Sequence, residues 1–234
     1  MLDLLRTLTL GATAGTLFAA LLSALPIRPG ARLALGAGIG TWISLVIALA
    51  GSGAVSGSPI VLPVLFALPL VAAGLAATSA ASRSAMMAIP AQLIIALNAM
   101  RVVGVLMVLA GVAGQMSGPF PYFAGIGDII TGVFALPVAR LAAKNPRDAR
   151  VLSWNIFGTL DLIVAVSLGV TSVNGSPLQV FHVGPGATAM TTLPWALIPL
   201  VLVPTFLIGH ALIFAHVRAA ASDANDARAR LAQA

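Results

Sequence analysis

Charged residues are scarce in this chain, and two kinds of side chain are missing altogether. Of 234 residues, only 8% are charged, against roughly 25% in an ordinary soluble domain. There is no cysteine, which excludes disulfides, thiol nucleophiles and cysteine-based metal sites. There is no glutamate either, so each of the six carboxylate side chains belongs to an aspartate. The few acidic residues can therefore be weighed one at a time.

Charge is also missing from two long stretches, residues 33–82 and residues 162–217. A water-soluble fold with so many consecutive uncharged residues would expose a large apolar patch. A helix that crosses a bilayer needs about 20 such residues, so each stretch is long enough for two crossings. Hydrophobic residues make up 59% of the chain. The sequence therefore predicts an all-α, polytopic membrane protein.

Breaks rich in Gly, Pro and Ser divide the chain into seven predicted spans. These are residues 5–25, 33–51, 60–79, 91–113, 121–141, 151–171 and 194–217. We expect one seven-helix transmembrane domain over residues 1–218 and a short polar cytoplasmic tail over residues 219–234. Glycine pairs at four-residue spacing, Gly11 with Gly15 and Gly36 with Gly40, are typical of close contacts between membrane helices.

Basic residues follow the positive-inside rule. The first, third and fifth loops and the segment after the last span contain them, whereas the second, fourth and sixth loops contain neither Lys nor Arg. This alternation predicts an N-terminus outside and a C-terminus in the cytoplasm, and Arg6 is the exception. The abundance of Ala, Gly and Arg beside a single Lys indicates a bacterial source. We therefore expect a multi-pass protein of a bacterial inner (plasma) membrane.

The net charge of +6 does not predict a nucleic-acid partner. The basic residues lie singly or in pairs at the ends of apolar runs, and they form no basic face with interleaved aromatic residues. The predicted partners are the lipid bilayer and a small solute or a proton. A partner subunit or a homo-oligomer is left open. No cofactor is expected, and no metal site, since His210 and His216 lie six residues apart on different sides of a helix.

Three charged residues fall inside the predicted spans: Arg101, Asp128 and Asp161. A charge at the centre of a bilayer costs about 2.5–3.5 kcal/mol on insertion scales, so such groups must be paired, hydrated or neutralised. From a rise of about 1.5 Å per residue, Arg101 and Asp161 lie roughly 15 Å from the inner ends of their spans, and Asp128 lies roughly 20 Å from its own. All three groups lie near the middle of the bilayer, where an arginine fork that bridges both carboxylates is geometrically available.

Other polar residues share helix faces with these three at spacings of three or four. The candidate ligand- or ion-binding set is Arg101, Asp128, Asp161, Asn98, Asn155, Thr131 and His210. Two interpretations have similar weight. In one, the set lines the site of a small proton- or cation-coupled carrier. In the other, the protein is a structural or accessory membrane protein in which the Arg–Asp cluster only fixes helix packing.

A membrane-embedded enzyme acting on lipid or peptide is the third interpretation. Residues Gly125–Asp128 spell GxGD, which resembles the motif of presenilin-type intramembrane aspartyl proteases and implies Asp128 and Asp161 as a catalytic pair. The chain departs from that family in three respects. The order of the two aspartates is reversed, Leu160 stands before Asp161 in place of tyrosine, and no Pro-Ala-Leu element follows. We assign no catalytic residues.

Overall fold

A computed structural model describes the backbone of residues 2–232 and the side chains of residues 3–221. Its long helices are α1 (Leu2–Ala24), α2 (Pro29–Gly51), α4 (Val61–Thr78), α8 (Phe120–Lys144), α9 (Ala149–Ser172) and α10 (Val203–Ala232). Shorter elements are α3 (Ala54–Gly57), α5 (Ala80–Met87), α6 (Ala91–Leu97), η1 (Asn98–Gly104), α7 (Val105–Val112), η2 (Thr188–Thr191) and η3 (Ile198–Leu202). No strand occurs within the described backbone.

Seven helical stretches in the described part of the chain are long and apolar enough to cross a membrane. They confirm the predicted number and the all-α class. The fourth stretch combines α6, η1 and α7, and the seventh begins at Ile198 with η3 and continues into α10. Large apolar side chains such as Leu75, Val133 and Phe134 are more than half exposed on the outside of the bundle. These features suggest a multi-pass membrane protein.

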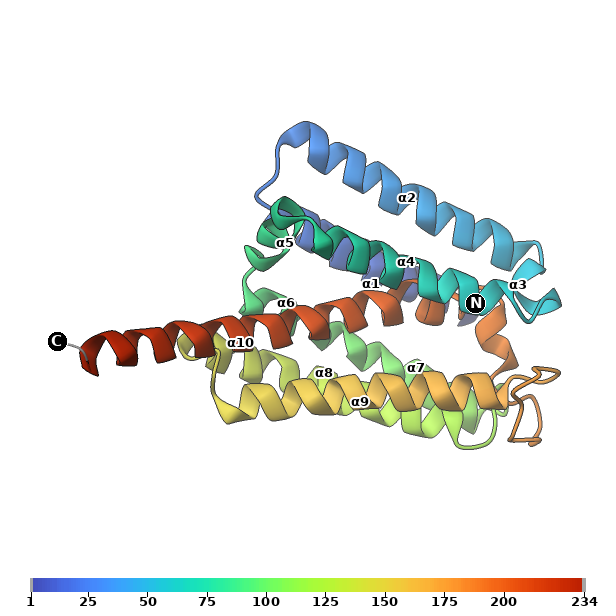
Figure 1. Cartoon of the computed structure of the whole chain (residues 1–234). Coiled ribbons are helices and arrows are strands. Elements are labelled where there is room, and N and C mark those ends of the chain that lie inside the picture. Colours follow the sequence, from blue (N-terminus) through green and yellow to red (C-terminus); the bar gives the residue numbers. More distant parts are fainter. Residues whose placement is uncertain (1, 233–234) are drawn as a thin grey trace.

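The two ends of the chain lie at opposite ends of the bundle (Figure 1). The N-terminus shares its end with the long α9–α10 connection, whereas α5 and the far part of α10 lie at the other end. An odd number of crossings requires this arrangement. α10 continues without a break to Ala232, so the polar segment predicted as a tail extends the last helix.

The helices that carry the predicted site form one compact part of the bundle. α8 packs between the α6–η1–α7 unit and α9, and α10 lies against α6, α9 and α4. α2 is the most peripheral long helix and contacts mainly α1 and α3. The polar residues predicted to meet are therefore on elements that contact one another directly.

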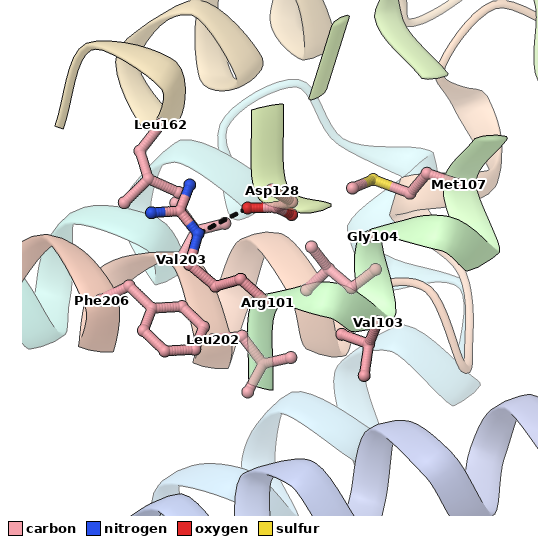
Figure 2. A pocket seen from close by; sticks show the side chains of 10 residues that line it. Arg101, Val103, Gly104, Met107, Asp128, Leu162, Leu202, Val203 and Phe206 are labelled. Atoms are coloured by element: carbon pink, nitrogen blue, oxygen red, sulfur yellow. Dashed lines mark hydrogen bonds and ion pairs between the residues drawn. The ribbon is translucent and has the colours of Figure 1, made fainter. Parts of the chain in front are cut away.

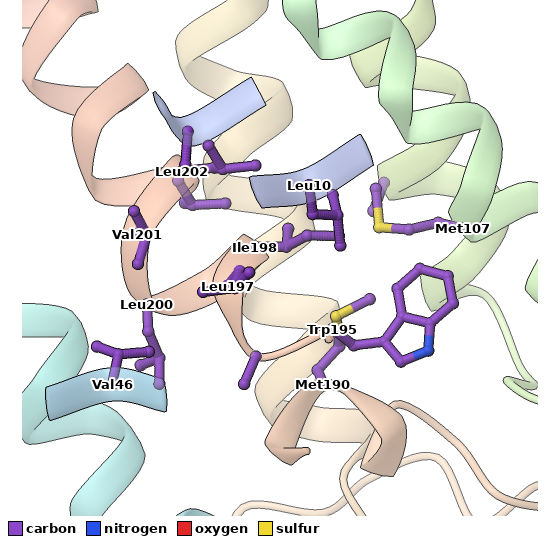
Figure 3. Close-up of a cluster of buried hydrophobic side chains, with 14 of the residues drawn as sticks. Leu10, Val46, Met107, Met190, Trp195, Leu197, Ile198, Leu200, Val201 and Leu202 are labelled. Atoms are coloured by element: carbon purple, nitrogen blue, oxygen red, sulfur yellow. The ribbon is translucent and has the colours of Figure 1, made fainter. Parts of the chain in front are cut away.

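The seventh span begins later than predicted. Residues 193–196 form a turn, η3 is one π-helical segment that contains Pro199, and α10 starts at Val203. Trp195, in that turn, is only 5% exposed and packs with Leu10 and Met107 in the apolar core (Figure 3). The Arg6 guanidinium carbon lies 5.1 Å from the centre of the Trp195 ring. This stacking explains how Arg6 is accommodated at the end of the bundle that has few cations.

The predicted glycine contacts between helices are largely absent. A Cβ atom placed on Gly11, Gly15 or Gly40 would meet no atom of the described chain within 4 Å, and on Gly36 it would meet only Leu22 at 3.6 Å. Close helix approach depends instead on glycines of η1, α8 and α9. The spacing rule identified small residues correctly but could not tell which faces of α1 and α2 point toward a neighbour.

α9 begins with a charged cap at the end of the bundle opposite the N-terminus. The Asp148 carboxylate accepts a hydrogen bond from the Arg150 backbone N–H at 2.9 Å and forms an ion pair with the Arg150 guanidinium at 2.7 Å. These hydrogen bonds and the positive charge lower the pKa of Asp148 to about 2. The cap is therefore ionised at any pH above that value, where it complements the helix N-terminus.

Candidate functional site: a buried arginine between two aspartates

Arg101 is the centre of the site. It lies on η1, a 3-10 segment in the middle of the fourth apolar stretch, and its side chain is completely buried. Its Nε donates to Asp128 Oδ1 at 2.7 Å, and its Nη2 donates to Asp161 Oδ2. Figure 2 shows the bond to Asp128. One edge of the guanidinium therefore bridges a carboxylate from α8 and another from α9.

The other edge of Arg101 contacts α9 and α10. Nη1 donates to the Gly158 carbonyl oxygen at 3.3 Å and lies 3.1 Å from His210 Nε2. Four of the five N–H donors of the guanidinium are thus engaged. A buried N–H donor without a hydrogen-bond acceptor destabilises the folded state. This set of acceptors therefore explains how a full positive charge can be buried.

His210 is held by Asn155, one helix away. Its Nδ1 lies 2.7 Å from Asn155 Oδ1, and the Asn155 amide donates to the backbone carbonyl of His210 at 3.2 Å. Because an amide oxygen only accepts, Nδ1 carries the proton and Nε2 accepts from Arg101. The contacts therefore define a neutral His210 with one fixed tautomer.

Aromatic side chains that the sequence analysis did not single out enclose this network. The Trp154 and His210 ring centroids are 5.5 Å apart, and Trp154 Nε1 donates to the backbone carbonyl of Thr131 at 3.1 Å. The Phe206 ring centroid lies 5.7 Å from the Arg101 guanidinium carbon, within the range of a cation–π contact. Helical spacing from His210 could have indicated Phe206, four residues earlier on the same face.

Five members of the predicted set form one connected network: Arg101, Asp128, Asp161, His210 and Asn155. The other two are buried beside it without joining it. The Asn98 amide donates to the Ile94 carbonyl at 3.0 Å. Asn98 Oδ1 and Thr131 Oγ1 have no hydrogen-bond partner among the described residues.

Glycines make the close approach of η1, α8, α9 and α10 possible. A Cβ on Gly104 would lie 2.5 Å from Asp128 Cβ, and one on Gly158 would lie 2.6 Å from His210 Cε1. A Cβ on Gly127 would collide with the Asp161 carboxylate, and one on Gly125 would lie 2.7 Å from the Gly104 carbonyl oxygen. The two glycines of the GxGD sequence therefore serve packing, one against η1 and the other against Asp161.

The network contains more negative than positive charge. Two carboxylates and one guanidinium, with His210 neutral, leave one net negative charge. The adjoining cavity, lined by Asp128 and by apolar residues such as Leu202 and Val203, has a volume of about 10 Å³. This is about the space that one water molecule needs. Both carboxylate side chains are largely enclosed, with 15% of the Asp128 side chain and 8% of the Asp161 side chain exposed.

Comparison with known proteins places the chain in a family. Residues 59–218 match the model of a family described as Domain of unknown function (DUF8737). The chain belongs to this family. The DUF8737 region begins just before α4 and ends within α10, so it includes all the network residues and leaves α1 and α2 outside. No curated protein and no solved structure matches the chain.

Proposed function

We propose that this DUF8737 protein is a small proton-coupled carrier of a bacterial inner membrane, and that the Arg101 network is its proton-binding site. One observation carries the proposal: two carboxylates accept from the same edge of one buried guanidinium, which leaves a net charge of −1. In a medium that solvates ions poorly, a single bound proton neutralises the network. Its release and uptake form the step that a carrier can couple to movement of a solute.

The distribution of charge supports a cytoplasmic C-terminus. The described cations outside the network lie at the end of the bundle opposite the N-terminus, apart from Arg6: they are Arg28, Arg32, Arg83, Arg140, Lys144, Arg147, Arg150 and Arg218. Arg6 is paired with Asp3 at 2.9 Å and stacked on Trp195. By the positive-inside rule, the end that is rich in cations faces the cytoplasm.

Two irregular helical segments beside the site also support a carrier. η1, which holds Arg101, is a 3-10 segment, and η3, which lines the adjoining cavity through Ile198 and Leu202, is a π segment. Mid-helix segments of these types often mark functional hinges. Transporters of several folds bind their substrates where helices are discontinuous. A proton fits the present closed arrangement, and a larger solute requires these segments to move.

The size of the cavity favours a second candidate function, in which the network only locks the helices in register. A volume of about 10 Å³ admits no solute beyond water. Nearly all donors of Arg101 are already engaged. A fixed ion-pair core would have both properties. Buried ionic groups serve specificity in some proteins, and a permanently closed network in this chain would serve that role alone.

Infrared spectroscopy of the purified protein in lipid nanodiscs distinguishes these two functions. We expect the wild-type spectrum to contain the carbonyl-stretch band of a protonated carboxyl group. This band should disappear as the pH is raised, and it should be missing from the spectrum of the Asp161→Asn or the Asp128→Asn protein. Asp148→Asn, at the N-cap of α9 and outside the network, is the matched control and leaves the band intact. A wild-type spectrum in which every titrating carboxyl band survives in both Asp161→Asn and Asp128→Asn would assign the network to the structural role.

Coupled transport is tested by proton flux into liposomes that contain the protein and a trapped pH indicator. We expect one solute class in a broad panel to drive a flux in wild-type protein. The flux should fall at least about tenfold in Asp161→Asn, since a proton-transfer group typically contributes a factor of 10²–10⁴. Folded wild-type protein that binds the proton but gives no flux with any solute would contradict the carrier assignment.

A further inference from the structure

A second cavity lies on the side of α10 that faces away from the Arg101 network. It has a volume of about 600 Å³ and is formed by α4, α5 and α10. This volume is within the range of about 300–1,000 Å³ typical of small-molecule sites. The lining is apolar, with Gly74 on α4, Met86 and Met87 on α5, and Leu207 and Ala211 on α10. A single charged residue, Arg83 of α5, completes it.

The position of the cation defines one end of this groove. Arg83 lies in α5, the short helix that links α4 to α6 at the cation-rich end of the bundle. Its Nη1 donates to the Ala77 carbonyl oxygen, near the C-terminus of α4, at 3.3 Å. This bond holds the guanidinium beside the C-terminal end of α4 and leaves other N–H donors for a ligand. From Leu207 to Ala215 the groove follows α10 for about 12 Å.

We propose that this groove binds one acyl chain of an anionic phospholipid and that Arg83 binds its phosphate. Charge complementarity favours this occupant: the groove is apolar along its length and positive at the end where a bilayer has its headgroups. A guanidinium forms paired hydrogen bonds with phosphate oxygens. Methionine side chains, such as Met86 and Met87, adapt to a flexible chain. The site does not depend on the function proposed for the Arg101 network.

Native mass spectrometry of the detergent-purified full-length protein tests the site. The probes are phosphatidylglycerol and phosphatidylcholine with identical acyl chains, added one at a time. We expect wild-type protein to retain one phosphatidylglycerol about fivefold more strongly than phosphatidylcholine, the effect of one surface cation on an anionic lipid. Arg83→Gln should abolish this preference. Arg140→Gln, an exposed arginine at the same end of the bundle, is the matched control and should keep it.

The apolar part of the site is tested by filling it. A Cβ on Gly74 meets no described atom within 4 Å, so Gly74→Leu fits the helix while occupying the groove, and we expect it to reduce retention of both lipids. Gly40→Leu, with equally open space in α2, is the control. Ala211→Leu fills the groove from α10 if Gly74→Leu does not fold.

Three results would overturn the proposal. They are equal retention of the two lipids by wild-type protein, an Arg83→Gln protein indistinguishable from Arg140→Gln, and lipid retention unchanged by both groove-filling variants. The last result would indicate annular lipid only. Failure of this site leaves the infrared test of Asp128 and Asp161 unaffected, because Arg83 does not contact the network.

Discussion

Replacing Arg101 by glutamine is expected to give the largest loss of stability of any single substitution in the chain. Arg101 is completely buried and pairs with Asp128 and Asp161. Its removal leaves two carboxylates without a counter-charge in the interior. Breaking a buried ion pair from one side costs about 3–5 kcal/mol. The measurement is the midpoint of thermal unfolding in detergent, together with the fraction of protein that elutes as a single folded species.

The cause of that loss is tested by restoring neutrality. The triple variant Arg101→Gln, Asp128→Asn, Asp161→Asn contains no buried charge, and we expect it to recover most of the lost stability. Arg140→Gln, at an exposed site, is the control and should differ from wild-type protein by no more than about 0.5 kcal/mol. If the triple variant is no more stable than Arg101→Gln, the uncompensated carboxylates are not the reason for the loss.

Gly127→Ala is expected to give the second-largest effect, although it adds only one methyl group. The new Cβ would occupy the space of the Asp161 carboxylate, so either α8 and α9 separate or Asp161 moves away from Arg101. Overpacking costs about 1–3 kcal/mol, and displacement of the carboxylate adds to it. We expect the free energy of unfolding to fall by about 3 kcal/mol in total.

A glycine of α1 provides the matched control. Gly15→Ala places its methyl group in open space and should be neutral or stabilising by up to about 1 kcal/mol, since alanine is the better helix former. In the double variant Gly127→Ala, Asp161→Ala the collision is relieved, so the two effects should be markedly less than additive. Additive effects would mean that residues 127 and 161 are not in contact.

The all-α membrane class and the charged residues of the central cluster follow from patterns that are visible in the sequence. Uncharged runs give the number of crossings, and the distance along each helix gives the depth of Arg101, Asp128 and Asp161. Helical spacing then gives the face on which each residue lies. Groups at similar depth on inward faces have few possible partners, so a bridge from Arg101 to both carboxylates was one of the arrangements that the sequence allowed.

Features that depend on contact between helices could not be anticipated. Gly104 and Gly127 lie at close contacts between helices, whereas Gly11 and Gly15 face open space, and nothing local in the sequence separates glycines of these two kinds. Periodicity says which residues share a face but not what that face meets. The cavity between α4, α5 and α10 could not be predicted from the sequence either, because residues on three separate elements form it.

Irregular helical turns were also missed. The sequences around η1 and η3 are largely apolar, so they are compatible with 3-10, α or π turns alike. Hydrophobicity does not distinguish such small changes in helical pitch. Pro199 marked one of the two positions, but no residue marked the other. Arg6 has one partner close in sequence and one far away. Asp3 is three residues away, within the range of helical spacing, whereas Trp195 is distant in sequence and no local pattern connects it to Arg6.

The most direct test of the buried network is the distance between nitrogen and carbon nuclei in the protein within a lipid bilayer. Solid-state NMR with ¹⁵N-labelled arginine and ¹³Cγ-labelled aspartate reports dipolar contacts between guanidinium and carboxyl groups. Asp161→Asn and Asp128→Asn assign the contacts by difference. We predict that one arginine contacts two carboxyl carbons at hydrogen-bonding distance and that each variant removes one contact. Spectra in which neither variant removes an arginine contact would contradict a network centred on Arg101.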